Sequence, residues 1–469
     1  MGILWFGEVL KGNPARPANH MLNRSSMMTL LVCLVAPFLR AQDNTNSAPV
    51  PVASERWNLY YQATSIGQYH GSFNAPYTGP LSLLPHTEMD VSLTMTLFFG
   101  LRLPWNTLLY VDPEVAGGRG FSNVDGLANP TNGELPRVAT ATPKPYLARL
   151  YLTHDFGFGS EKEDVESDAN QLSGSRPVTR YTISIGRFSM SDFFDNNTYT
   201  HDPRSQFMGW GVMYNGAWDY PADTRGYTWG WVHEIHTANW SFRYGSAAVS
   251  KVANGGRFDR RLFRDRGDVI EGERRYKLNA HPGVLRVLAY ANHYDGGKYS
   301  DALQLAAATN TTPDVNKVLK IGALKYGFGI NWEQEIANGI GLFMRLGWND
   351  GKTESFEFTA IDRLATGGIS FSGARWKRHD DTVATELTVA GISAVHALYL
   401  ARGGLDFLIG DGQLNYAPEY NWETYYNAHL YKWFFAALDA QHIDNPAYNH
   451  DRGPLWAFSL RLHIEGGWK

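Results

Sequence analysis

The chain of 469 residues has one cysteine, few charged residues and no long hydrophobic run. Charged residues make up 19% of it, whereas about 25% is usual for a soluble domain. No apolar segment approaches the roughly 20 consecutive residues that a membrane-spanning helix requires, which excludes a helical membrane protein. The net charge of −4 argues against a nucleic-acid partner, because such proteins bind by neutralising phosphates.

Aromatic residues and glycine are abundant. Phe, Trp and Tyr form 14% of the chain, and glycine contributes 47 residues. This aromatic content is too high for a disordered chain. Two classes remain, a soluble β-rich protein and a β-barrel of an outer membrane.

The start of the sequence resembles an export signal. The apolar run 27–38 follows the basic residue Arg24, and small residues follow the run. This pattern predicts a secretory signal over residues 1–41. About the first twenty residues are not needed for such a signal. A polar linker follows at 42–56. Because Cys33 lies in the signal, the exported protein has no disulfide.

From Trp57 onward, apolar and polar residues alternate with the period of two that is typical of strands. In the clearest case, Trp456, Phe458, Leu460, Leu462 and Ile464 share one face. Polar residues and arginine occupy the other face. The predicted strands are 57–69, 89–102, 105–112, 146–156, 178–188, 227–236, 239–250, 284–294, 323–331, 340–349, 382–390, 421–430, 433–441 and 456–465.

These segments are long enough to cross a lipid bilayer, which takes about 9 to 11 tilted residues. The side chains on their apolar face are large and often aromatic, while those on the other face are small or polar. A soluble sheet would carry many charges on its outer face, and this chain has few. The pattern therefore predicts an all-β fold, a transmembrane antiparallel β-barrel over residues 57–469, with lipid outside and water inside.

No catalytic or metal-binding motif stands out. His233 and His236 are an odd number of residues apart, so on a strand they point to opposite faces and cannot share an ion. Phosphate-binding loops, zinc-protease motifs and nucleophile elbows are absent from the sequence. We expect no enzyme activity, no cofactor and no metal.

The face opposite the lipid face carries several arginines. An arginine pointing into a lumen offers several donors to sugar hydroxyls, and nearby aromatic rings can stack on a pyranose. The alternative is that these arginines pair with acidic loops and only stiffen the barrel. The candidate pore-lining residues are Arg102, Arg149, Arg180, Arg243, Arg345, Arg461 and Glu423.

Motifs along most of the chain resemble the carbohydrate-selective porins of the OprB type. The resemblance extends over about residues 57–468. Its motifs lie at 68–70, 75–80, 110–114, 126–128, 132–134, 186–188, 192–195, 200–207 (THDPRSQF), 216–221, 224–228, 410–412, 423–426 and 445–454. The resemblance implies a 16-stranded barrel in the outer membrane of a Gram-negative bacterium, with loops folded into the lumen. The Pro- and Gly-rich stretch 113–145 is the best candidate for such a loop.

The resemblance also implies a function, passive and sugar-selective diffusion of mono- or oligosaccharides. A general, non-selective porin is an alternative, and a secreted carbohydrate-binding or glycan-cleaving β protein is another. Outer-membrane lipid and the barrel-assembly machinery are the further expected partners of a monomer or trimer. The pattern predicts that the tail from Gly466 to Lys469 extends past the last strand, although such barrels commonly end on an aromatic residue.

A separate group of charged residues lies between Asp192 and Thr228. The density of Asp, Asn, Arg and Trp in this segment indicates a structured loop rather than a flexible connection. The most plausible internal ion-pair partners there are Asp202, Arg204, Asp219 and Arg225.

Overall fold

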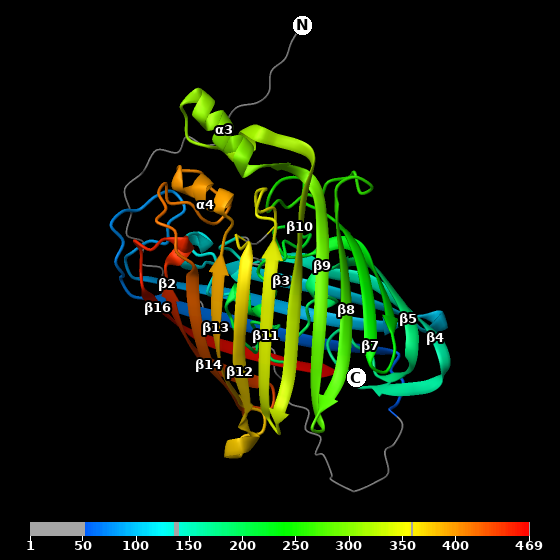
Figure 1. The fold of residues 1–469 in the computed structure, drawn as a ribbon. Helices are drawn as coiled ribbons and strands as arrows, with labels where there is room; N and C mark the ends of the chain where they lie inside the picture. Colours follow the sequence, from blue (N-terminus) through cyan, green and yellow to red (C-terminus); the bar gives the residue numbers. More distant parts are fainter. Residues whose placement is uncertain (1–51, 136–139, 358–359, 469) are drawn as a thin grey trace. The chain divides into compact units, whose positions relative to one another are not determined.

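The computed structural model describes residues 52–135, 140–357 and 360–468. The predicted signal lies outside these residues. Sixteen antiparallel strands form a closed barrel, in which each strand pairs with its neighbours in sequence and β1 pairs with β16 (Figure 1). The predicted fold class is confirmed. Within the described part of the chain, no helix is long and apolar enough to span a membrane.

The strands are β1 (Trp57–His70), β2 (Glu88–Arg102), β3 (Thr107–Gly118), β4 (Lys144–Val165), β5 (Gly174–Phe188), β6 (Thr228–His236), β7 (Trp240–Ala248), β8 (Arg266–Leu278), β9 (His281–Gly297), β10 (Leu319–Ala337), β11 (Ile340–Asn349), β12 (Arg363–Ser372), β13 (Thr382–Gly391), β14 (Glu419–Tyr431), β15 (Phe434–Asp444) and β16 (Leu455–Trp468). The helices are η1 (Pro104–Asn106), η2 (Phe121–Val124), η3 (Met190–Asp192), α2 (Trp210–Met213), α3 (Tyr299–Thr309), η4 (Val315–Val318), α4 (Ala394–Ala401), η5 (Gly373–Trp376) and η6 (Pro446–Tyr448).

Strand β16 shows why these residues form a barrel wall. Leu460 is 48% exposed on the outer face, whereas its neighbour Arg461 is fully buried inside. The same alternation holds for Phe458 and Ser459. Successive side chains of a strand point to opposite faces, so the apolar residues meet lipid while the polar residues meet the interior. The predicted orientation of this strand is confirmed.

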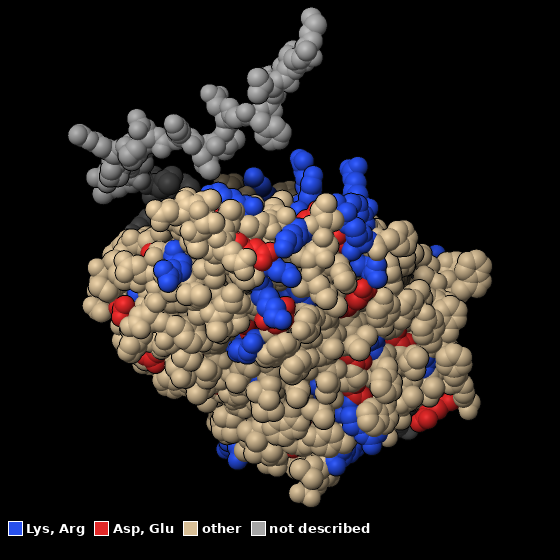
Figure 2. Space-filling model, turned by 45° about the horizontal axis from the view of Figure 1, so that its top comes forward, with Lys and Arg blue, Asp and Glu red and all other residues tan. Residues whose placement is uncertain are grey.

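The two ends of the barrel differ. Connections such as Asn338–Gly339 are short turns at one end, and loops such as 189–227 are long and lie at the other. Helices α3 and α4 lie at the long-loop end (Figure 1). In outer-membrane barrels the short turns face the periplasm and the long loops face the outside. Figure 2 shows that uncharged side chains cover most of the visible wall.

The core of the molecule lies inside the barrel. The loop between β5 and β6, residues 189–227, supplies the buried aromatic residues Phe194, Trp210 and Trp218. These pack against inward-facing residues of the wall such as Val232. The segment predicted to be a structured loop is therefore a folded plug of side chains rather than a flexible connection.

Several boundaries differ from the prediction. Strands β8 and β12 were missed, because neither has a clear apolar face. Strand β3 continues to Gly118 and β4 begins at Lys144, so the inward loop is shorter than the predicted range 113–145. Residues 466–468 belong to β16, and Trp468 pairs with Leu59 of β1. The prediction that these residues extend past the last strand is therefore wrong.

Candidate functional site

Two long loops fold into the barrel and are held there by carboxylates of the wall. They are residues 119–135 of the β3–β4 loop and the β5–β6 loop, residues 189–227. Glu419 on β14 accepts hydrogen bonds from the N–H groups of Ala128 at 2.9 Å and Asn129 at 2.7 Å. A loop inside a barrel has backbone N–H groups that strands do not satisfy, and an ionised carboxylate is a strong acceptor for them.

Glu423 does the same for the second loop. Its two carboxylate oxygens accept from the N–H groups of Met208 at 2.5 Å and Gly209 at 2.9 Å, at the start of α2. Because the side chain is fully buried, this predicted pore residue anchors a loop in the structure.

Arg345 holds the same loop from a strand three places away from β14 in the barrel wall. It lies on β11 and donates from Nε to Asp195 at 2.9 Å. Its other nitrogens donate to the carbonyl oxygens of Val212 at 2.7 Å and Thr200 at 2.9 Å. Each nitrogen of the guanidinium donates to a protein oxygen, and the side chain is not exposed to the lumen.

Arg149 is the next predicted residue that meets acidic partners. Its Nε and Nη2 donate to the two oxygens of Asp192 at 2.7 and 2.6 Å, and Nη1 lies 3.3 Å from Asp112. The ring of Tyr227 lies beneath it, 5.3 Å from the guanidinium carbon. The pair joins β4 to the first turn of the inward β5–β6 loop.

A line of alternating charges crosses the wall from β6 to β10. Arg243 contacts three carboxylates, those of Glu234 and Glu271 at 2.9 Å and that of Glu273 at 3.0 Å. Glu273 also accepts from Arg286 at 3.0 Å. Arg180 lies beyond this line on β5. Arg180 donates to Glu163 at 3.1 Å and lies 3.8 Å from Asp155.

The last two predicted arginines bind backbone carbonyls. Arg461 donates to the carbonyl oxygens of Pro203 at 2.7 Å and Gln206 at 2.5 Å. Arg102 lies at the short-turn end, where it donates to the carbonyl oxygens of Glu55 and Ser173 at 2.9 Å. Arg102 is therefore apart from Arg149, Arg345, Arg461 and Glu423, which contact the inward β5–β6 loop.

Two of the four residues predicted as ion-pair partners, Arg204 and Asp219, have oppositely charged partners outside the β5–β6 loop. Arg204 donates to Glu114 at 3.1 Å and to Glu134 at 3.0 Å. The Asp219 carboxylate lies 3.2 Å from Nζ of Lys325 on β10, and both side chains are buried.

The remaining two have different contacts. The carboxylate of Asp202 accepts from the backbone N–H of Arg204 at 2.9 Å. The guanidinium of Arg225 lies over the ring of Tyr146 at 4.2 Å. Sequence reasoning missed the acidic partners of the predicted arginines. Strand parity in the predicted strand 227–236 is a signal for Glu234, which pairs with Arg243. Glu271 and Glu273, the other partners of Arg243, lie on β8, which the sequence pattern did not predict.

A cavity of about 500 Å³ opens among the long loops, and we name it the long-loop cavity. Four different loops contribute to it. Two aromatic residues, Trp210 and Phe407, lie in its lining with the amides of Asn123 and Asn254 and the guanidinium of Arg119. Flat aromatic faces beside hydrogen-bonding groups suit a ligand with both C–H faces and hydroxyl groups.

The sequence matches the family described as carbohydrate-selective porins, OprB family, over residues 95–465. The chain belongs to the OprB family. A comparison with curated proteins by sequence gives no significant match. The barrel is similar to the high-pH structure of OprB from Pseudomonas putida, with 16% identity and a TM-score of 0.64 over 87% of this chain and 94% of that one.

Two further structures of outer-membrane channels are similar over comparable lengths. The low-pH structure of Pseudomonas putida OprB has 13% identity and a TM-score of 0.45, over 87% of this chain and 92% of that one. The channel DcaP of Acinetobacter baumannii has 9% identity and a TM-score of 0.46, over 89% and 98%. Family membership makes this OprB-family protein a sugar-selective channel of the Gram-negative outer membrane, in preference to a general porin or a secreted protein.

Proposed function

We propose that neutral mono- or oligosaccharides cross this OprB-family barrel by passive diffusion, with no covalent step and no cofactor. The observation that supports this is the pairing of charges in the interior. Arg149, Arg204, Arg243, Arg286 and Arg345 each lie within 3.5 Å of a carboxylate oxygen. A lumen with compensated charges has no strong preference for ions, so hydroxyl, amide and aromatic groups decide which solute binds.

The long-loop cavity is the first place where we expect a sugar to bind. Phe407 contributes an aromatic ring beside the largely buried Trp210, and Asn123, Asn254 and Arg119 offer hydrogen-bond donors. Contacts of this kind replace part of the hydration shell of the sugar. They have to be weak, because a solute that binds tightly cannot leave a channel.

The predicted arginines have an indirect part in this proposal. Arg149, Arg243 and Arg345 hold the inward loops and the wall in place, and the loops then fix the width of the passage. Glu423 acts in the same way through its bonds to Met208 and Gly209. We infer further that outer-membrane lipid surrounds the apolar wall, that the barrel-assembly machinery inserts it, and that it works as a monomer or trimer.

Planar-bilayer recordings test the proposal. Glucose or maltodextrins are expected to reduce the ion current saturably, with millimolar affinity. Replacing Phe407 by Ala should weaken this block, because the sugar loses an aromatic face. Leu305→Ala, on the exposed side of α3, is the control and should leave the block unchanged. Unsaturable passage of sugars and amino acids alike would contradict the proposal.

A further inference from the structure

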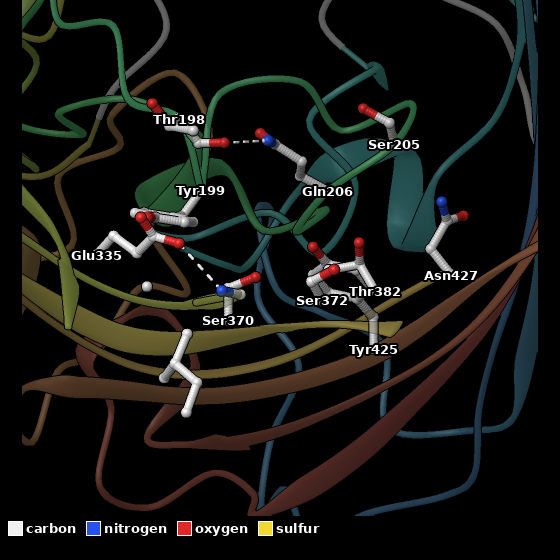
Figure 3. Close-up of a pocket in the computed structure, with 13 residues that line it drawn as sticks. Thr198, Tyr199, Ser205, Gln206, Glu335, Ser370, Ser372, Thr382, Tyr425 and Asn427 are labelled. Carbon is white, nitrogen blue, oxygen red and sulfur yellow. Dashed lines mark hydrogen bonds between the residues drawn. The ribbon is translucent and has the colours of Figure 1, made fainter. Parts of the chain in front are cut away.

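A second cavity lies at the opposite end of the barrel, and we name it the short-turn cavity. Its volume is about 350 Å³, within the range of roughly 300–1,000 Å³ that is usual for small-molecule sites. The inward β5–β6 loop forms one side, and strands β11 to β14 with the β10–β11 turn form the other (Figure 3).

Hydroxyl groups dominate this cavity. Thr198, Ser205, Ser370, Ser372 and Thr382 line it with the phenols of two tyrosines and the amides of Gln206 and Asn427. No lysine or arginine is among the lining residues. Hydroxyl groups both donate and accept hydrogen bonds, so they suit a ligand whose own groups are hydroxyls.

The one carboxylate of the lining is already in use. Glu335 accepts from the N–H of Gly339 at 3.0 Å, within the turn that joins β10 to β11, and its other oxygen lies 3.4 Å from Nδ1 of His281. Arg461 approaches the cavity through Asn427 at 3.3 Å, but two carbonyl oxygens hold its guanidinium. A neutral ligand fits this environment better than an ion.

The ring of Tyr199 packs against the backbone of Gly341 in the wall. A Cβ atom added to Gly341 would lie 2.0 Å from two ring carbons of Tyr199, so only glycine lets the ring lie against β11. On another side of the cavity, Tyr425 is fixed by an edge contact with Phe207, at 4.9 Å between ring centres. The two rings are therefore positioned before any ligand arrives.

The loop side of the cavity is also rigid. The N–H of Thr198 donates to Glu333 at 2.6 Å, and its carbonyl accepts from Gln206 at 2.8 Å, as the dashed line in Figure 3 shows. The amide oxygen of Gln206 accepts from the N–H of His201 at 2.6 Å. A preformed cavity reduces the entropy that a weakly bound ligand would otherwise lose in ordering the protein.

We propose that the short-turn cavity is a second binding site for a neutral sugar, at the periplasmic end of the passage. This inference rests on the proposed function and adds a site that is separate from the long-loop cavity. The sugar pauses at the long loops, passes the inward loop and binds again among the hydroxyls of β11 to β14. Two weak sites in series speed transfer, because neither one holds the sugar strongly.

Cysteine protection tests the site directly. Cys33 is the only cysteine in the sequence and lies in the predicted signal, so we expect no competing thiol in the exported barrel. Ser372→Cys places a thiol in the cavity lining, and His379→Cys places one on the exposed β12–β13 turn at the same end. Glucose is expected to slow the reaction of a small water-soluble thiosulfonate several-fold at Ser372→Cys and to leave the rate at His379→Cys unchanged.

The two proposals fail in different ways. If glucose blocks the ion current of Ser372→Cys but does not protect its thiol, the short-turn site is wrong and the proposed function stands. If glucose neither blocks nor protects in a folded barrel, the proposed function itself fails. Ser370→Ala provides a second measurement, because it removes a hydroxyl with little change in volume. It should weaken the block by glucose added on the short-turn side, and an unchanged block there would overturn the site.

Discussion

The guanidinium of Arg345 donates from Nε to the carboxylate of Asp195 at 2.9 Å, although the two residues are 150 positions apart in the sequence. The pair connects the wall of the barrel to the loop that fills it. Both side chains are almost completely buried. An arginine that strand parity places in the lumen is therefore a structural link between wall and plug.

Replacing Arg345 by Ala should strongly destabilise the barrel. Breaking a buried pair leaves an uncompensated charge, and the usual loss is about 3–5 kcal/mol of unfolding free energy. Urea unfolding of the purified protein in detergent measures it. Asp195→Asn in the same chain should restore part of the stability, because the unpaired charge is gone. If the Arg345→Ala variant keeps the unfolding free energy of the unchanged protein but binds sugar differently in the block experiment, Arg345 is a pore residue instead.

Glu419→Gln should loosen the β3–β4 loop. The carboxylate accepts from the N–H groups of Ala128, Asn129 and Ala447, and the amide has only one oxygen to accept with. Hydrogen bonds to a charged group contribute about 1.5–3 kcal/mol. We expect a higher single-channel conductance with a weaker sugar block. Tyr420→Phe, on the outer face of the same strand, is the control that should change neither quantity.

The lipid face of β16 gives a third prediction. Leu460 lies near the middle of this strand and is 48% exposed. An arginine near the bilayer midplane costs about 2–4 kcal/mol, so Leu460→Arg should lower the free energy of unfolding in lipid bilayers by this amount. Leu460→Phe keeps an apolar side chain at this position, so its free energy of unfolding should stay close to that of the unchanged protein. Equal stability of the two variants would place this face away from lipid.

A buried histidine among the long loops makes stability depend on pH. His396 on α4 lies 3.1 Å from both Asp362 and Asp406 and stacks on Tyr299 at 4.3 Å. Burial alone would lower the pKa of His396, but the two carboxylates outweigh burial and raise this pKa to about 9. In the unfolded chain the pKa is about 6.5.

The sign of the effect follows from these two values. Because the folded protein binds the proton more tightly, the stabilisation is complete below about pH 6.5 and is lost as the pH rises through about 9. A shift of this size corresponds to about 3 kcal/mol. Proteolysis of the α3 and α4 loops, followed between pH 6 and 10, should accelerate at high pH. His396→Gln should remove the pH dependence, and a flat profile in the unchanged protein would contradict the assignment.

Strand periodicity was sufficient to predict most of the barrel from the sequence. Where one face is apolar, as in β16, alternation gives the strand and its orientation together. It failed for β8, because Asp268 and Arg274 on its outer face hide the apolar side. It failed for β12 because Gly367 and Gly368 interrupt the pattern.

The sequence by itself determined the class of the fold, since alternation over many strands fixes which side of each strand meets lipid. It also placed the arginines on the inner face. Only the tertiary structure decided what those arginines do, because their partners lie on other strands or on loops far away in sequence, as with Arg345 and Asp195. The alternation of inward and outward side chains is a local property of one strand. Charge pairing and cavity shape depend on which distant segments the closed barrel brings together.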